Sequence, residues 1–340
     1  MQSLVRLWNY RLFGLLLCLC VQQQGWAQQF LREAPPLHPT LLALGGTNLT
    51  KAGAGALALQ NIALADSLLE HRFSVSMARF GPSFTGGQVQ FSHAAPLEGT
   101  WTHAISLLTV DGGVGADAQG QPLADPRVQS LQLQTGYARG TQVLRYGFAL
   151  GLRQSTVALI QESAFFFQLG FLYQHPVENV RIALAFEQAG LLYRSTEEEL
   201  PPGGLTRPLL RFGVGFRPEG LPIGLHASLG DPLGQGSSRP DPLGGLAQVA
   251  RQRQGLESLV FAAELFIREQ LTFQLGYRQA MRSGLQGLDG IGLTGISTGL
   301  RAAVGEVTLS YGHLFQAFAP GSFHAISLST SLQRKKRFDE

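Results

Sequence analysis

The amino-acid sequence predicts an all-β fold, a transmembrane antiparallel β-barrel of about 14 strands with a small N-terminal plug. Three observations predict this fold class. The chain begins with the layout of an export signal. From residue 72 onward, apolar residues alternate with small or polar ones over stretches of about ten residues. The connections between these stretches are alternately short and long, which is typical of outer-membrane barrels.

Residues 1–27 are predicted to form a cleaved signal peptide. Arg6 and Arg11 supply positive charge, an apolar run follows at residues 12–21, and Gly25 and Ala27 are small residues at the positions that a signal peptidase recognises. The apolar run is about ten residues long, whereas a spanning helix needs about 20. An uncleaved membrane anchor is therefore the less favoured alternative.

Both cysteines of the chain, Cys18 and Cys20, lie inside this segment, and each follows a leucine, which argues against lipidation. Cleavage would leave no cysteine. We therefore expect no disulfide, thiol nucleophile or cysteine-ligated zinc site.

Composition narrows the class of the exported part. Charged residues make up 14% of the chain, against about 25% in soluble proteins. Glycine is abundant, at 42 of 340 residues, and no stretch is long and apolar enough for a spanning helix. These features leave a secreted β-sandwich or solenoid, or a closed barrel. The net charge of +3 comes mostly from the signal and from the basic tail at residues 333–340, so it does not indicate nucleic-acid binding.

Residues 28–70 do not alternate and are predicted to form the plug. The stretches 41–48 and 57–65 are apolar with Gly, Asn and Gln, which favours short helices and turns. An exposed apolar patch of this kind is avoided on soluble surfaces. We therefore favour a position inside the barrel over a loose periplasmic arm.

The barrel itself is predicted for residues 71–332. Successive strand side chains point to opposite faces, so one face of each predicted strand is apolar and the other is small, polar or charged. Sandwich strands are usually five or six residues long, whereas spanning strands need about 9–11. Tyr137, Tyr173, Tyr277 and Tyr311 lie near strand ends, as in interfacial girdles. The predicted strands are residues 72–80, 86–95, 99–110, 127–139, 143–155, 163–175, 179–190, 208–218, 222–230, 256–267, 270–280, 294–303, 305–315 and 322–332.

The lengths of the connections predict the orientation of the barrel. One set is short (residues 96–98, 140–142, 176–178, 219–221, 268–269 and 304), and the other is long (residues 111–126, 191–207, 231–255 and 281–293). The turn at residues 81–85 is a short exception in the second set. Outer-membrane barrels have short periplasmic turns and long extracellular loops. The predicted location is thus the outer membrane of a Gram-negative bacterium, with both termini in the periplasm.

Five charged residues fall on inward-facing positions and are candidate lumen residues: Arg153, Glu187, Arg211, Arg217 and Arg278. The favoured interpretation is that they pair with each other and with the plug, because barrel lumens are ordinarily polar. The alternative is an anion or ligand site, since charges inside a membrane protein often mark function.

A catalytic alternative is an outer-membrane hydrolase. His226 and Ser228 share one strand face and Asp231 follows, so a hydroxyl–imidazole pair is conceivable. Close spacing is weak support, because such sites are recognised by geometry. The histidines show no metal-ligand spacing, and the paired glycines lack phosphate-binding spacing. We predict no catalytic residue, metal or cofactor.

Five short motifs stand at residues 30–31, 43–48, 59–63, 275–278 and 323–332, and the motif residues in the plug are Gly45, Gly46, Asn48, Gln60 and Asn61. Together they resemble the PorQ family of the type IX secretion system, which is similar to the wider barrel group that includes PorV and the FadL fatty-acid transporters. The resemblance covers essentially the whole mature chain. Ile62 stands where the family usually has proline, a departure from its plug motif.

The resemblance implies a non-catalytic outer-membrane barrel in Bacteroidota. Such a barrel helps to hold a surface protein, PorZ, in an attachment complex with PorU and PorV, which removes a C-terminal signal from cargo and anchors the cargo to lipopolysaccharide. The implied partners are a PorZ-like protein, the PorU and PorV complex, and outer-membrane lipid or lipopolysaccharide. The alternative is FadL-like transport of hydrophobic molecules, against which the polar and glycine-rich inward faces argue.

Overall fold

The computed structural model describes residues 36–51, 58–65, 72–80, 84–95, 99–110, 128–157, 160–195, 205–206, 208–230, 258–268, 270–279, 292–315 and 323–332. The predicted signal peptide and basic tail lie outside these residues, as do most of the predicted long loops and Asp231. Within the described residues, no helix combines the length and the apolar character that crossing a membrane requires.

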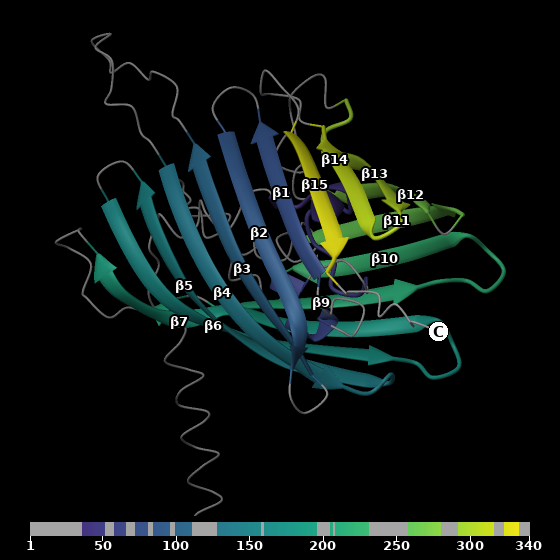
Figure 1. Ribbon diagram of the computed structural model, residues 1–340, viewed down its shortest axis with the longest axis horizontal. Helices are drawn as coiled ribbons and strands as arrows, with labels where there is room; N and C mark the ends of the chain where they lie inside the picture. The colour runs from purple at the N-terminus through teal and green to yellow at the C-terminus, as the bar shows by residue number, and fades with distance from the viewer. Residues whose placement is uncertain are drawn as a thin grey trace, which may run out of the picture.

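The described residues form one antiparallel sheet of 15 strands, in which β8 is a two-residue addition to β7. Figure 1 shows the strands curving into a barrel. The strands are β1 Arg72–Phe80, β2 Phe84–Ala95, β3 Gly99–Val110, β4 Val128–Gly140, β5 Leu144–Val157, β6 Ile160–Gln174, β7 Val180–Ser195, β8 Leu205–Thr206, β9 Leu209–Phe216, β10 Ile223–Gly230, β11 Leu259–Ile267, β12 Leu271–Arg278, β13 Ile296–Val304, β14 Val307–Leu314 and β15 Phe323–Ser331.

The sheet closes on itself as a barrel of 14 strands. The first strand, β1, pairs with both β2 and the last strand, β15, and the chain of neighbours continues through β6–β7. Closure removes the free sheet edges that a membrane does not tolerate. The predicted fold class is therefore confirmed, and every predicted strand overlaps an observed one.

The two faces of the wall differ as the alternation predicts. Large apolar residues of the strands are exposed on the outside, for example Leu150 and Leu152 on β5. The inward positions between them are buried and small or polar, such as Gly151, Arg153 and Ser155. An apolar outer band with a polar interior is the arrangement that lipid requires of a spanning barrel.

The plug segments, residues 36–51 and 58–65, pack against the inner wall (Figure 1). The first contains helix α3, Pro39–Ala43, which contacts β12, β13, β14 and β15. The second contains the 3-10 helix η2, Ile62–Leu64, which contacts β4, β5 and β6. Both helices are shorter than the predicted stretches 41–48 and 57–65, because glycines end α3 early and Asn61 starts η2 late.

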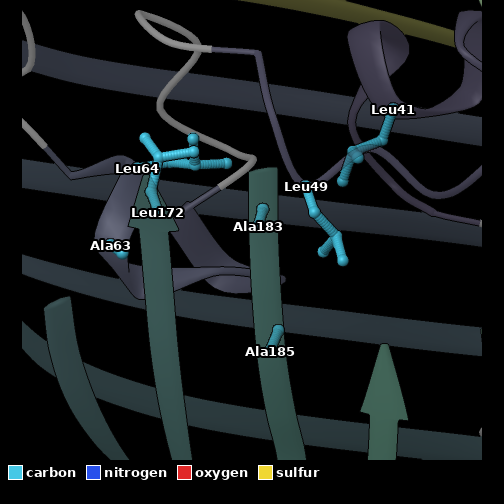
Figure 2. Packing of buried hydrophobic residues seen from close by; sticks show 7 residues of the cluster. All are labelled: Leu41, Leu49, Ala63, Leu64, Leu172, Ala183 and Ala185. Carbon is cyan, nitrogen blue, oxygen red and sulfur yellow. The ribbon is translucent and has the colours of Figure 1, made fainter. Parts of the chain in front are cut away.

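An apolar contact joins the plug to the wall at β6 and β7. Leu41, Leu49 and Leu64 of the plug belong to one buried cluster with Leu172 of β6 (Figure 2), and each of the four is at most 5% exposed. The same cluster includes Ala63 of the plug and two alanines of β7, Ala183 and Ala185. Small wall residues leave room for large plug residues. The hydrophobic core of this barrel thus lies within the lumen.

Strand β7 differs from its predicted range of 179–190. It continues to Ser195 and carries β8, so part of the predicted loop 191–207 belongs to the sheet. The pairing of β6 with β7 shifts register between Phe167 and Leu169, beside Gln188, which has a positive φ of 59°. Such a β-bulge lets a long strand bend without losing its partner. At the first outer turn, β2 begins at Phe84 rather than residue 86.

Candidate functional site

The site is built on the plug, and its first part is the end of helix α3. Gly45 and Gly46 have φ angles of 81° and 90°, which side chains with a Cβ rarely adopt. Their N–H groups donate to the carbonyls of Leu42 and Leu41 at 3.2 and 2.8 Å. This is the usual way in which glycine ends a helix. The turn brings the Gly45 N–H to Ser297 Oγ on β13, at 3.1 Å.

The amides of the plug motif join the two plug segments. Asn48 Oδ1 accepts from the backbone N–H groups of Thr50 and Lys51, both at 3.0 Å. Gln60 Oε1 accepts from Asn48 N–H at 3.2 Å, and Gln60 Nε2 donates to Gly46 O at 2.9 Å. These bonds satisfy backbone groups that are removed from water. Four of the five motif residues therefore meet at one point of the plug.

The fifth motif residue, Asn61, ties η2 to the wall. Its Oδ1 accepts from Ala63 N–H at 3.1 Å, and its Nδ2 lies within hydrogen-bond distance of Leu49 O and Phe171 O. The turn at Asn61 therefore forms with isoleucine at position 62. Ile62 is 1% exposed, and it packs against Gly136 and Gly147, where an added Cβ would lie within 3 Å of its side chain.

A buried ion pair links the plug to β11. Lys51 and Glu264 are 5% and 3% exposed, and Lys51 Nζ contacts Glu264 Oε1. Gln274 Nε2 donates to the same oxygen at 2.9 Å, and His226 Nε2 lies 3.2 Å from Oε2. Several hydrogen bonds around one carboxylate are what a buried ion pair needs to offset its desolvation.

His226 is engaged at both ring nitrogens, because Thr50 Oγ1 lies 2.9 Å from Nδ1 while Glu264 occupies Nε2. The hydroxyl that contacts the His226 ring belongs to Thr50, which is fully buried. Ser228, the partner weighed from the sequence, is 3% exposed. This arrangement fixes the plug against β10 and β11, and it presents neither hydroxyl to a substrate.

A cavity of about 270 Å³ lies at the end of the barrel where the connections are short. The buried ion pair forms part of its lining, together with Arg181, Arg217, Arg301 and aromatic residues of the wall. The Arg217 guanidinium lies 4.5 Å from the ring centroid of Phe266, a cation–π distance. Arg181 Nη1 donates to Thr50 O of the plug at 3.3 Å.

A second cavity, of about 220 Å³, lies on the opposite side of the plug. Four of the five predicted lumen charges line it: Arg153, Glu187, Arg211 and Arg278. Arg211 Nη1 lies 3.5 Å from Glu187 Oε1, which agrees with mutual pairing. The fifth, Arg217, lies at the other end, so the predicted lumen charges do not form one group.

Three residues of the cavity lining were not predicted from the sequence: Lys51, Glu264 and Arg301. Two signals were available. Lys51 is a lone cation beside an apolar segment, and Glu264 and Arg301 stand at inward positions of β11 and β13. Their closeness in space depends on barrel closure and plug register, which a single sequence does not reveal.

His38, which precedes α3, provides a pH-dependent feature of the plug. It is 6% exposed, and its Nδ1 accepts from Thr40 N–H at 3.2 Å. Burial, and then repulsion by Arg301, lower the pKa of His38 from 6.5 to about 3. The folded state thus favours the neutral ring. Its stabilising contribution is complete above pH 6.5 and is lost as the pH falls from 6.5 towards 3.

We therefore expect the plug to open more readily in acid. Between pH 6 and 4, a cysteine placed at Ala63, in a variant in which Cys18 and Cys20 are replaced by alanine, should be labelled faster by a thiol reagent, once the labelling rates are corrected for the fraction of the thiol that is ionised. The opening equilibrium should rise by about tenfold per pH unit. In His38→Asn, which keeps a capping acceptor, this slope should disappear; an unchanged slope would contradict the assignment.

Comparisons with solved structures find FadL-family outer-membrane barrels as structural neighbours of this fold. The P. putida toluene transporter TodX aligns with a TM-score of 0.54 and 9% identity, covering 87% of this chain and 99% of that one. The TodX monoaromatic hydrocarbon channel deltaS2 mutant gives 0.56 and 11%, covering 87% and 98%. A Pseudomonas aeruginosa FadL homologue gives 0.53 and 6%, covering 88% and 99%.

At these identities the likeness extends to the fold alone. No protein-family model matches the sequence, and no curated protein matches it significantly. Two of these solved neighbours are named as a toluene transporter and a monoaromatic hydrocarbon channel. They correspond more closely to the transport alternative than to the anchoring function implied by the sequence motifs.

Proposed function

We propose that the protein is a plugged, non-catalytic outer-membrane barrel that serves as a scaffold at the cell surface rather than as an open channel. The observation that carries this proposal is the attachment of the plug to the wall. The ion pair between Lys51 and Glu264, the bond from Asn61 Nδ2 to Phe171 O, the bond from Gln168 Nε2 to Gln60 O, and the apolar cluster at Leu172 hold it at separate points. A plug held in this way favours a closed lumen.

The chemistry of the lumen supports the same proposal. The lining of each of the two cavities beside the plug includes arginines and a carboxylate, next to apolar residues such as Leu41 in one and Phe266 in the other. An apolar solute that passed through them would remove water from these charges without replacing their hydrogen bonds, which is costly. The described lumen therefore offers poor surroundings for a hydrocarbon.

The working surface in this proposal is the end with long connections. Strands β3 and β4 are joined by residues 111–127, and β10 and β11 by residues 231–258. Loops on a rigid scaffold commonly carry recognition. In line with the sequence motifs, the partner would be a PorZ-like surface protein of a type IX attachment complex with PorU and PorV, with the short turns and both termini in the periplasm.

The test is to replace residues 232–256 by a short Gly-Ser linker and to extract the barrel with its neighbours. We expect at least a tenfold loss of the co-purified surface protein, while folding, followed by heat-modifiable electrophoretic mobility, is unchanged. A linker inserted at the β13–β14 turn after Gly305, at the other end, is the control. Extraction of the native barrel with no surface protein would contradict the scaffold.

Transport of hydrophobic molecules is the second candidate, and the likeness of the fold to the TodX and FadL-homologue barrels favours it. A strain that lacks the whole gene separates the two functions. Loss of uptake of a monoaromatic hydrocarbon on deletion of the whole gene, with surface-protein attachment intact, would support transport and overturn the scaffold.

A further inference from the structure

We propose that the cavity at the short-turn end of the lumen binds a phosphate group, clamped between the plug and the wall by Arg217, Arg301 and Arg181. This site is distinct from the long-loop surface of the proposed scaffold, and it does not depend on that function. It rests on the charge, the enclosure and the existing pairing of the residues around the cavity.

The cavity carries an excess of positive charge. Among the described residues, its lining contains four cationic side chains, of Lys51, Arg181, Arg217 and Arg301, and one carboxylate, that of Glu264. Arg181 and Arg301 both lie close enough to Lys51 to repel its ammonium group. Like charges gathered in a partly dehydrated space disfavour one another. An anion in the cavity would relieve this repulsion.

Glu264 cannot neutralise all of these cations, because its oxygens are already engaged. One oxygen contacts Lys51 and Gln274, and the other lies beside His226. Arg301 is attracted by the same carboxylate, and it also lies near the buried ring of His38. Among the described residues that line the cavity, no carboxylate other than Glu264 stands beside Arg217 and Arg301, so an anion in the cavity would be a suitable counter-ion for these two arginines.

Two of the arginines are positioned in advance. Arg217 rests on the ring of Phe266 at 4.5 Å, and Arg181 is held by the carbonyl of Thr50. A guanidinium that is fixed by stacking or by a backbone contact loses little freedom when it binds, and its planar donors match phosphate oxygens. The wall contributes the three arginines of the lining and the plug contributes Lys51. Bound phosphate would therefore also stabilise the plug against the wall.

The size of the cavity limits the ligand. A space of about 270 Å³ accommodates a phosphate with a small substituent and excludes a folded partner. The phosphate could come from the solution or from the headgroup of a phospholipid. Both share the chemistry that the arginines recognise, and the experiment below separates them.

The experiment titrates the purified full-length barrel, in detergent at low ionic strength, with inorganic phosphate, dihexanoyl phosphatidic acid or dihexanoyl phosphatidylcholine, by isothermal calorimetry. We expect saturable binding of phosphate. Tighter binding of the phosphatidic acid would identify a lipid headgroup as the source, and tighter binding of free phosphate would identify a soluble one. Added salt should weaken either.

Arg301→Gln and Arg217→Gln should each weaken phosphate binding by about tenfold or more. Arg139→Gln is the matched control, because Arg139 is exposed at the same end, on β4, and does not line the cavity. Its affinity should equal that of the native protein. If Arg301→Gln fails to fold, Arg217→Gln alone decides. The absence of saturable binding by any probe, or equal affinity in Arg217→Gln and the native barrel, would overturn the proposal.

Discussion

Replacement of Lys51 by methionine is expected to release the plug from the barrel wall. The change leaves the Glu264 carboxylate, which is 3% exposed, without its ammonium partner. Loss of one member of a buried ion pair costs about 3–5 kcal/mol. At the lower value, the equilibrium for opening the plug should rise by about 150-fold. The same cysteine at Ala63 would report the opening by its rate of labelling.

The double variant Lys51→Met with Glu264→Gln separates the charge from the packing. It removes both charges and leaves an amide that still bonds with Gln274 and His226, so labelling should fall well below that of the single variant. Additive effects of the two changes would show that the residues do not act as a pair. A native labelling rate in Lys51→Met would show that the ion pair does not hold the plug.

The strands could be predicted from the sequence because lipid imposes a simple rule on them. A residue such as Leu150 or Phe171 faces the membrane, and its neighbours Gly151 and Gly170 face the lumen. This constraint acts on every residue of the wall, so each strand is visible in the order of its own residues. Closure then follows, since an open edge inside lipid leaves backbone groups unpaired.

The candidate site could be predicted only in part, because its contacts join distant parts of the chain. Lys51 meets Glu264 across 213 positions, and Thr50 meets His226 across 176. The sequence suggested a pair between His226 and Ser228, two residues away, whereas in the fold His226 contacts Thr50 of the plug. The plug motif was predicted from the family resemblance, and the structure shows that Gly45, Gly46 and Asn61 act locally in it, at the ends of its short helices.

The β-bulge at Gln188 could not be predicted from the sequence of β7 alone. The alternation with large apolar residues ends at Phe186, yet the strand extends to Ser195 after a shift in register with β6. The shift depends on the strand beside it. It also lets Gln188 line the 220 Å³ cavity beside Glu187; the alternation predicted an inward position for Glu187 but not for Gln188.

Replacement of Gly276 by alanine should displace helix α3 from the wall. Gly276 faces inward on β12, and a Cβ there would lie 2.3 Å from Gly45 N and 2.6 Å from the carbonyl carbon of Leu44. Both are backbone atoms that cannot rotate away. The Cβ would also meet Ser297 Oγ at 2.4 Å, the atom that accepts from Gly45 N–H and donates to Ala43 O. Overpacking of this kind costs about 1–3 kcal/mol, to which the loss of these bonds would add.

The barrel of Gly276→Ala should still form, because the new methyl group points into the lumen and the ladder bonds of β12 with β11 and β13 run through the backbone. Its effect should therefore appear in the plug and not in the wall. In a planar lipid bilayer, we expect native protein to pass little current and Gly276→Ala to open far more often. Gly87→Ala is the control, because a Cβ at Gly87 would have its nearest neighbour at 3.7 Å. Equal conductance in the two variants would mean that contact between Gly276 and the Gly45 turn does not keep the lumen closed.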